Sequence, residues 1–167
     1  MYYICAKYIL IIHHFVELSC NAPQALLEGN TYYVPWTAYS ASSEYYEAYE
    51  ASFAYSGWSS NNRDSGWLQV DLGAQFLVAE ILTKGTARSD NEWVTSYKVR
   101  YQESMGSDMV MIRNADDTQV VFSGNWDKHT LKTNVLPEPI VMRIIRIVVH
   151  DVHDWASMRL EVKGCPV

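Results

Sequence analysis

Apolar residues recur at every second position along much of this chain, and no stretch after residue 19 keeps an apolar period of 3.6 residues. In residues 94–101 the side chains of Tyr97, Val99 and Tyr101 fall on one face of an extended chain, with polar side chains between them. Residues 157–163 alternate in the same way. A period of two is typical of half-buried strands in an antiparallel sheet, so the pattern predicts a β protein.

Further strands are indicated by near-continuous apolar runs at residues 76–82, 120–122 and 144–149, which suit strands covered on both faces. Polar or glycine-containing turns separate the strands, at residues 61–66, 88–91, 106–108, 114–118 and 134–139. Seven or eight short strands with this spacing predict a sandwich or a barrel. The chain has 167 residues, no internal repeat and no linker, so we expect one all-β domain.

The chain is acidic, with 13 Lys and Arg residues against 19 Asp and Glu residues and a formal net charge of −6. Nucleic-acid-binding proteins draw most of their affinity from basic side chains that replace counterions on phosphate, so the composition argues against that class. Binding to anionic membranes by charge alone is disfavoured for the same reason. With 49% hydrophobic and 13% aromatic residues, the chain has enough apolar surface for a folded core.

The first 19 residues differ from the rest of the chain. An apolar run, Tyr8–Ile12, follows the single basic residue Lys7. The run is too short to span a bilayer, which takes about 20 apolar residues. It resembles a poor secretory signal peptide that lacks a clear small-x-small cleavage site. Residues 1–19 are therefore a possible signal peptide, and the alternatives are an incomplete or mis-started reading frame or a flanking segment packed on the domain.

The chain has three cysteines, Cys5, Cys20 and Cys165. Removal of residues 1–19 would remove Cys5 and leave one pair that encloses nearly the whole domain. Such a pair predicts a structural disulfide between Cys20 and Cys165, formed in an oxidising compartment, and hence a secreted or extracellular protein. Two buried free thiols are the alternative, and a retained Cys5 would be a free thiol or an intermolecular link.

Residues 20–165 carry a series of short motifs that together resemble, in content and order, the discoidin domain, also called the coagulation-factor (F5/8) type C domain. The motifs are Cys20-Asn21, Ser40-Ala41-Ser42-Ser43, Gly57-Trp58-Ser59, Trp67-Leu68-Gln69-Val70-Asp71-Leu72-Gly73, Trp93-Val94-Thr95-Ser96-Tyr97-Lys98-Val99, Phe122-Ser123-Gly124-Asn125, Arg146-Ile147, Met158-Arg159-Leu160-Glu161 and Gly164-Cys165. The resemblance implies an antiparallel jelly-roll β-sandwich of the galactose-binding-like kind over residues 20–165. It also implies ligand binding through loops at one end of the sandwich.

Most of these motifs are expected to build the core and not the binding site. Four apolar residues would supply its buried area: Trp67, Leu68, Val70 and Leu72. Gly73 can take a positive φ where that strand ends. Arg159 and Glu161 fall on the polar face of the last strand, where they could form an ion pair.

The first candidate binding loop is residues 44–51. It holds three tyrosines, Tyr45, Tyr46 and Tyr49. Their rings could stack on a sugar face or on an apolar side chain of a partner, although any of them could instead pack beneath the loop. The spacing of Glu44, Glu47 and Glu50 is also compatible with one face of a helical turn.

The second candidate loop, residues 85–92, offers Arg88 as a hydrogen-bond donor and Asp90 and Glu92 as acceptors. Collagen-binding members of the family use an Arg and a Glu in this loop, and Glu92 matches the position of that Glu. Thr86 stands where the Arg is usual, and Arg88 is an offset substitute. The resemblance therefore does not predict collagen binding.

The third candidate loop, residues 150–156, offers His153 and Trp155 as ligand-binding residues, with Trp155 as a stacking platform. Four residues of this loop have metal-ligating chemistry: His150, Asp151, His153 and Asp154. A His-x-x-His spacing alone is a weak signal, because a metal site needs three or four converging ligands. We therefore predict no metal site.

These features predict a secreted, non-catalytic binding module for adhesion or recognition that binds an extracellular glycan or glycoprotein and needs no cofactor. One open site of this kind binds weakly, so useful avidity would require oligomerisation or neighbouring domains in a longer protein. The alternative ligand is an anionic phospholipid, which some family members bind through apolar and basic loop tips. Residues 44–51, with three Glu and no Lys or Arg, disfavour it. No Gly-x-Ser-x-Gly, zinc-helix or phosphate-loop motif indicates an enzyme.

Overall fold

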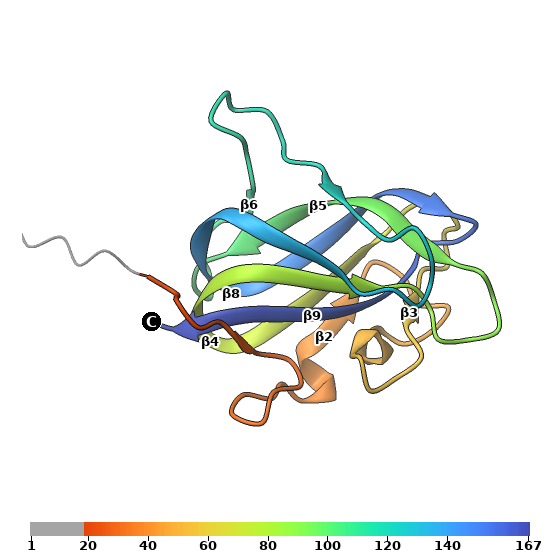
Figure 1. Cartoon of the computed structure of the whole chain (residues 1–167), viewed down its shortest axis with the longest axis horizontal. Helices are drawn as coiled ribbons and strands as arrows, with labels where there is room; N and C mark the ends of the chain where they lie inside the picture. Colours follow the sequence, from red (N-terminus) through yellow and green to blue (C-terminus); the bar gives the residue numbers. More distant parts are fainter. Residues whose placement is uncertain (1–18) are drawn as a thin grey trace, which may run out of the picture.

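Two long strands, β4 and β8, form the middle of the structure, and the other strands pair with them or with their neighbours (Figure 1). The computed structural model describes residues 19–167, so the predictions for Cys5 and the remainder of residues 1–18 lie outside the described residues. The elements in chain order are β1 (Gln24–Ala25), η1 (Trp36–Ala38), β2 (Tyr39–Ala41), η2 (Ala48–Ala51), β3 (Trp58–Ser59), β4 (Trp67–Lys84), β5 (Trp93–Gln102), β6 (Val110–Met111), β7 (Phe122–Ser123), β8 (Lys132–His153) and β9 (Ser157–Pro166). The predicted all-β fold is confirmed.

All strand pairs are antiparallel, in the order β1-β9-β4-β8-β5-β6, with β2 also paired to β4, β3 to β9 and β7 to β5. The register between β4 and β8 shifts between Asp71 and Phe76 and again between Val78 and Glu80. Such irregularities bend a strand. β4 pairs with β2 before the first shift and with β9 after it, so one bent strand joins both layers of the sandwich. Gly73 lies in the first irregularity with φ +80°, inside β4 and not at its end.

The core is built from the inward positions of the alternating strands. Tyr97 and Val99 of β5 and Leu68 of β4 have no exposed surface, whereas their sequence neighbours are half-buried. Trp67 was expected in the core, but its ring is only half-buried. Because Leu68 takes the inward position of β4, the neighbouring Trp67 faces outward, where the Arg146 guanidinium lies 4.1 Å from the ring centre.

Glu161 is a buried carboxylate and not the surface group that the alternation of the last strand suggested. Its Oε1 accepts hydrogen bonds from the backbone N–H groups of Leu26 (3.2 Å) and Leu27 (2.9 Å), and its Oε2 accepts one from Glu28 (3.1 Å). Burial raises the pKa of Glu161 despite these donors. The expected ion pair between Glu161 and Arg159 was wrong, because the Arg159 Nε donates to the Gly85 carbonyl (2.8 Å) instead.

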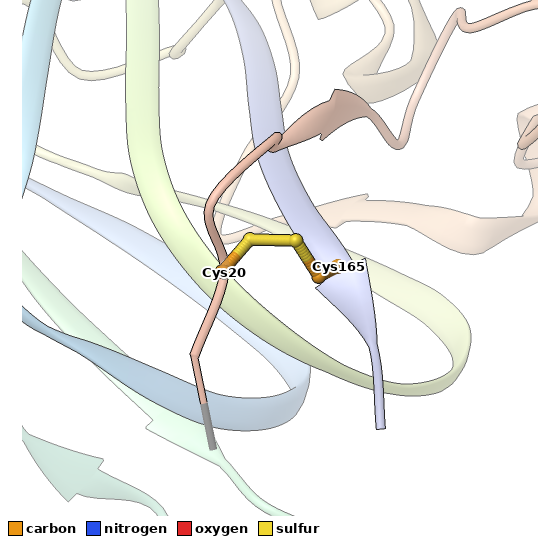
Figure 2. The surroundings of a disulfide bond; sticks show 2 residues. All are labelled: Cys20 and Cys165. Atoms are coloured by element: carbon orange, nitrogen blue, oxygen red, sulfur yellow. A yellow bond between two sulfur atoms is a disulfide. The ribbon is translucent and has the colours of Figure 1, made fainter. Parts of the chain in front are cut away.

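The two ends of the domain are joined covalently, as the cysteine count predicted. Cys20 and Cys165 form a disulfide with their Cα atoms 5.5 Å apart and a sequence separation of 145 (Figure 2). Next to it, β1 pairs with β9 through Gln24 and Gly164. The disulfide, this short ladder and the Glu161 carboxylate therefore hold the first segment against the last strand.

Replacing Cys20 and Cys165 by Ser should lower the free energy of unfolding by about 4 kcal/mol, because the disulfide closes a very long loop and restricts the unfolded chain. Urea denaturation followed by tryptophan fluorescence measures the change. An unchanged denaturation midpoint in the double variant would show that the disulfide adds nothing to stability.

The Glu161→Ala substitution should lower the free energy of unfolding by about 3 kcal/mol, because it leaves the amides of Leu27 and Glu28 without their acceptor, whereas the Leu26 amide keeps the Val162 carbonyl. Glu80→Ala is the matched control, since Glu80 forms only a 3.7 Å ion pair with Lys163 at the surface of the same strand pair. That control should cost less than about 1 kcal/mol. Equal losses in the two variants would contradict the anchoring role of Glu161.

Candidate functional site

Three loops meet at the end of the sandwich opposite to the termini, on the right in Figure 1, and enclose a pocket of about 360 Å³. The residues that line it are Tyr45, Tyr46, Asp90, Glu92 and Trp155. Each of the three candidate loops contributes to this loop-end pocket, and all five of its residues are among those that the sequence predicted. Residues that are far apart in the chain thus form one concave surface.

Aromatic rings form one wall of the loop-end pocket. The rings of Tyr45 and Tyr46 meet edge to face, with centroids 4.9 Å apart, and Tyr45 lies 6.4 Å from the ring of Trp155. Tyr45 is 64% exposed, whereas Tyr46 and Trp155 are half-buried. The backbone N–H of Tyr45 donates to the Ser59 carbonyl (2.8 Å), which fixes the start of this loop on β3. The exposed ring face is therefore available for stacking on a ligand.

The position of Trp155 is set by the tight turn between β8 and β9. Asp154 adopts a left-handed conformation with φ 64°, which reverses the chain and turns Trp155 toward the loop-end pocket. The indole Nε1 donates to the Ser60 carbonyl (2.7 Å). Arg63 holds the turn from outside, donating to the Asp154 carbonyl (2.6 Å) and to its carboxylate (2.9 Å). The tryptophan is thus held in place before any ligand arrives.

The two carboxylates of the loop-end pocket are supported differently. Glu92 accepts a hydrogen bond from the Ser157 hydroxyl (2.6 Å), which is itself bonded to Ser59. Asp90 is exposed, but its loop is held by Lys128, whose Nζ donates to the carbonyls of residues 88, 89 and 90 at 3.0 to 3.2 Å. The acidic wall therefore has a fixed backbone, and the Asp90 carboxylate has no hydrogen-bond or ion-pair partner within residues 19–167.

Arg88 lies behind the aromatic wall and not in the loop-end pocket. Its guanidinium pairs with Glu50, donates to the Gly57 carbonyl (2.6 Å) and lies 3.4 Å from the ring centre of Tyr46. Two of its nitrogen atoms, Nη1 and Nη2, thus donate to partners inside the protein. Whether Arg88 contacts a ligand stays a prediction, and the geometry gives it the role of supporting Tyr46.

Two further predicted residues, Tyr49 and His153, lie outside the loop-end pocket, as Arg88 does. Tyr49 points to the other side of its loop, where its ring meets those of Tyr55 and Trp36. His153 stacks on Trp93, with centroids 4.0 Å apart and an angle of 11° between the planes. Within residues 19–167 the structure brings together no group of three or more His, Cys, Asp or Glu side chains that could hold a metal ion.

Sequence reasoning missed the residues that hold the loops in place. Arg63, Lys128 and Ser157 each act on a loop that is distant in sequence, so no local pattern marks them. The one available signal was the position of Ser157 directly before the motif Met158-Arg159-Leu160-Glu161. The pocket that results is acidic, because Asp90 and Glu92 line it and no Lys or Arg of the described chain does.

A family model described as the F5/8 type C domain matches residues 37–162. This chain belongs to the F5/8 type C family. Mouse retinoschisin is 30% identical over 150 residues, which cover 89% of this chain and 62% of that protein. Rat lactadherin is 33% identical over 106 residues, which cover 63% of this chain and 24% of that protein. The F5/8 type C chain therefore spans about three fifths of the one relative and about a quarter of the other.

Solved structures of F5/8 type C-like folds match as well. Discoidin II of Dictyostelium discoideum superposes with a TM-score of 0.66 at 24% identity, over 77% of this chain and 55% of that one. A family 32 carbohydrate-binding module of C. perfringens, solved in complex with galactose, superposes with a TM-score of 0.63 at 19% identity, over 86% of this chain and all of that one. These matches confirm the predicted β-sandwich of the discoidin type.

Replacing Arg88 by Ala should lower the free energy of unfolding by about 1–2 kcal/mol, because the Gly57 carbonyl and Glu50 lose their partner. Arg113→Ala is the control, since Arg113 is exposed and pairs only with residues of its own hairpin. The Arg113→Ala variant should lower the free energy of unfolding by less than about 0.5 kcal/mol. Urea denaturation distinguishes the two, and equal stability of both variants would remove the supporting role.

Proposed function

We propose that this F5/8 type C domain is a secreted, non-catalytic module that binds a glycan of an extracellular glycoprotein in the loop-end pocket. The observation that carries the proposal is the composition of this pocket: aromatic rings on one wall and carboxylates on the other. The apolar face of a sugar ring stacks on aromatic side chains, while its hydroxyls donate to carboxylates. Tyr45, Trp155 and Asp90 offer these groups side by side.

The size and rigidity of the loop-end pocket support the same ligand class. About 360 Å³ lies at the lower end of the range for small-molecule sites, and it suits a terminal sugar. The hydrogen bonds of Trp155 and Glu92 hold the pocket before binding, which limits the ordering cost of a weak, open site. The groups present offer stacking and hydrogen bonding, and the proposed function involves no bond-breaking step.

An anionic phospholipid headgroup is the less favoured ligand. Asp90 and Glu92 line the loop-end pocket and would repel a phosphate. The cations behind the loops, Arg88 and Lys128, donate to protein carbonyls and a carboxylate instead of facing the opening. The charge distribution therefore favours a neutral sugar.

We also propose that the protein is secreted and binds its ligand through more than one site. The disulfide between Cys20 and Cys165 is typical of proteins from oxidising compartments. Because the loop-end pocket is small and open, we infer that functional binding uses several copies or further domains, which raise avidity without new contacts. The partial coverage of retinoschisin and lactadherin is compatible with a longer protein.

A glycan array tests the proposal, and galactose-terminated glycans belong on it because the C. perfringens module was solved with galactose. Tyr45→Ala and Trp155→Ala should each reduce binding on the order of tenfold, since each removes a stacking surface. Trp126→Ala is the matched control: Trp126 is 62% exposed, close to the 64% of Tyr45, but lies outside the loop-end pocket. Binding that survives both pocket substitutions, or that falls equally in the control, would refute the site.

Flotation with liposomes that contain or lack phosphatidylserine separates the two ligand classes. We expect no retention on either liposome, because the pocket is acidic. Retention only on phosphatidylserine, lost in Tyr45→Ala, would reverse the order of the two ligands.

A further inference from the structure

A second hollow lies on the other side of the 44–51 segment and is separate from the loop-end pocket. It has a volume of about 230 Å³, and Tyr33, Trp36, Tyr39, Tyr49 and Tyr55 line it together with Glu28. A neighbouring hollow of about 260 Å³ shares Trp36, Tyr39 and Tyr49 and adds Glu44 and Glu47. We call the two together the aromatic groove.

The rings of the aromatic groove form walls that face in different directions. Tyr49 lies at the centre, with its ring 6.4 Å from Trp36 at an interplanar angle of 73° and 5.3 Å from Tyr55 at 86°. Nearly perpendicular rings present both faces and edges to the same space. Trp36 is 67% exposed, Tyr33 73% and Tyr55 50%, so this aromatic surface is open to solvent. Such an exposed aromatic cluster marks an interaction surface.

The charges around the aromatic groove are all negative. Glu28, Glu44 and Glu47 line it, and no Lys or Arg of the described chain does. Within residues 19–167 none of these three carboxylates lies in an ion pair with a basic side chain. Glu28 and Glu44 each accept one backbone N–H, from Ala54 (2.9 Å) and Ala48 (3.2 Å), which positions them without neutralising their charge.

We propose that the aromatic groove binds a lysine or arginine side chain from a basic segment of a partner protein. A cation is attracted to the faces of Trp and Tyr rings, and the attraction strengthens as water is displaced. The three carboxylates also attract the cation, and this attraction acts over a longer range. Each hollow is smaller than a typical small-molecule site, so it admits a single side chain and not a folded element.

The same chemistry could in principle hold the trimethylammonium group of a choline lipid, but the charges favour a peptide. A choline headgroup carries a phosphate a few bonds from its cation, and Glu28, Glu44 and Glu47 would repel that phosphate. A basic peptide has no such anion. The charges of the aromatic groove therefore favour a protein partner with an exposed, positively charged segment.

The test uses a trilysine peptide, acetylated at its N-terminus and amidated at its C-terminus, added to the full chain labelled with ¹⁵N. The indole N–H signal of Trp36 should shift on titration, while that of Trp155 stays in place. The same peptide with all three lysine side chains acetylated keeps the length but loses the charge, and it should cause no shift. A shift at Trp155 alone, or equal shifts with both peptides, would overturn the proposal.

Variants separate the aromatic groove from nonspecific attraction to an acidic protein. Trp36→Ala and Glu47→Gln should each weaken trilysine binding about threefold or more. Trp36 is mostly exposed, so its removal should leave the fold intact. Glu103→Gln is the matched control, because it removes one exposed carboxylate outside the groove. Equal weakening by Glu47→Gln and Glu103→Gln would show that net charge, and not the groove, binds the peptide.

Two further measurements distinguish the aromatic groove from the glycan site and a basic peptide from a choline lipid. Trp155→Ala should leave trilysine binding unchanged, so the aromatic groove and the proposed glycan site can fail independently. Flotation with phosphatidylcholine vesicles should show no binding. Flotation that depends on Trp36, without a response to trilysine, would replace the basic peptide with a choline lipid as the ligand.

Discussion

The joining of the two chain ends along β9 is the constraint on which the rest of the sandwich depends. β9 lies between β1 and β4 and also pairs with β3, so it touches the first segment, a long central strand and the base of the loop-end pocket. A disulfide closes this arrangement at one end, and the buried carboxylate of Glu161 holds the backbone of residues 26–28 beside it. This end of the sandwich is therefore fixed by covalent and hydrogen bonds together.

The loop-end pocket is acidic because the basic side chains near it face away from the opening. Arg63, Arg88 and Lys128 each donate to backbone carbonyls of neighbouring loops. Their charges therefore serve to hold loops together, while Asp90 and Glu92 remain at the opening. A site with the same number of charged residues would be basic or neutral if these cations pointed the other way. The arrangement, and not the composition, makes this pocket acidic.

Much of the fold could be predicted from patterns in the sequence. The alternation around Tyr97 and Val99 marked β5, and the cysteine count gave the disulfide between Cys20 and Cys165. The family motifs then placed three loops at one end, and the structure brings five of their eight proposed ligand residues into one pocket. The strands could be predicted because alternation is a property of short segments, whereas the disulfide followed from the number of cysteines and the loop placement from the order of the family motifs.

The misses concern contacts between distant segments. Glu161 looks like a surface residue in an alternating strand, and only the packing of residues 26–28 over it shows that it is buried. The aromatic groove was also missed, because Tyr33 and Trp36 belong to a different segment from Tyr49 and Tyr55 and become their neighbours only through the fold.

The position of the disulfide has a mechanical consequence. Cys20 and Cys165 are bonded to each other, so extensions of the chain beyond them are attached at the same end of the domain (Figures 1 and 2). A pulling force between such extensions runs through the sulfur–sulfur bond and bypasses the strands. The sheet and the loops at the far end would then carry no load under tension. A module built in this way can be pulled by its tethers while its ligand-binding surface keeps its shape.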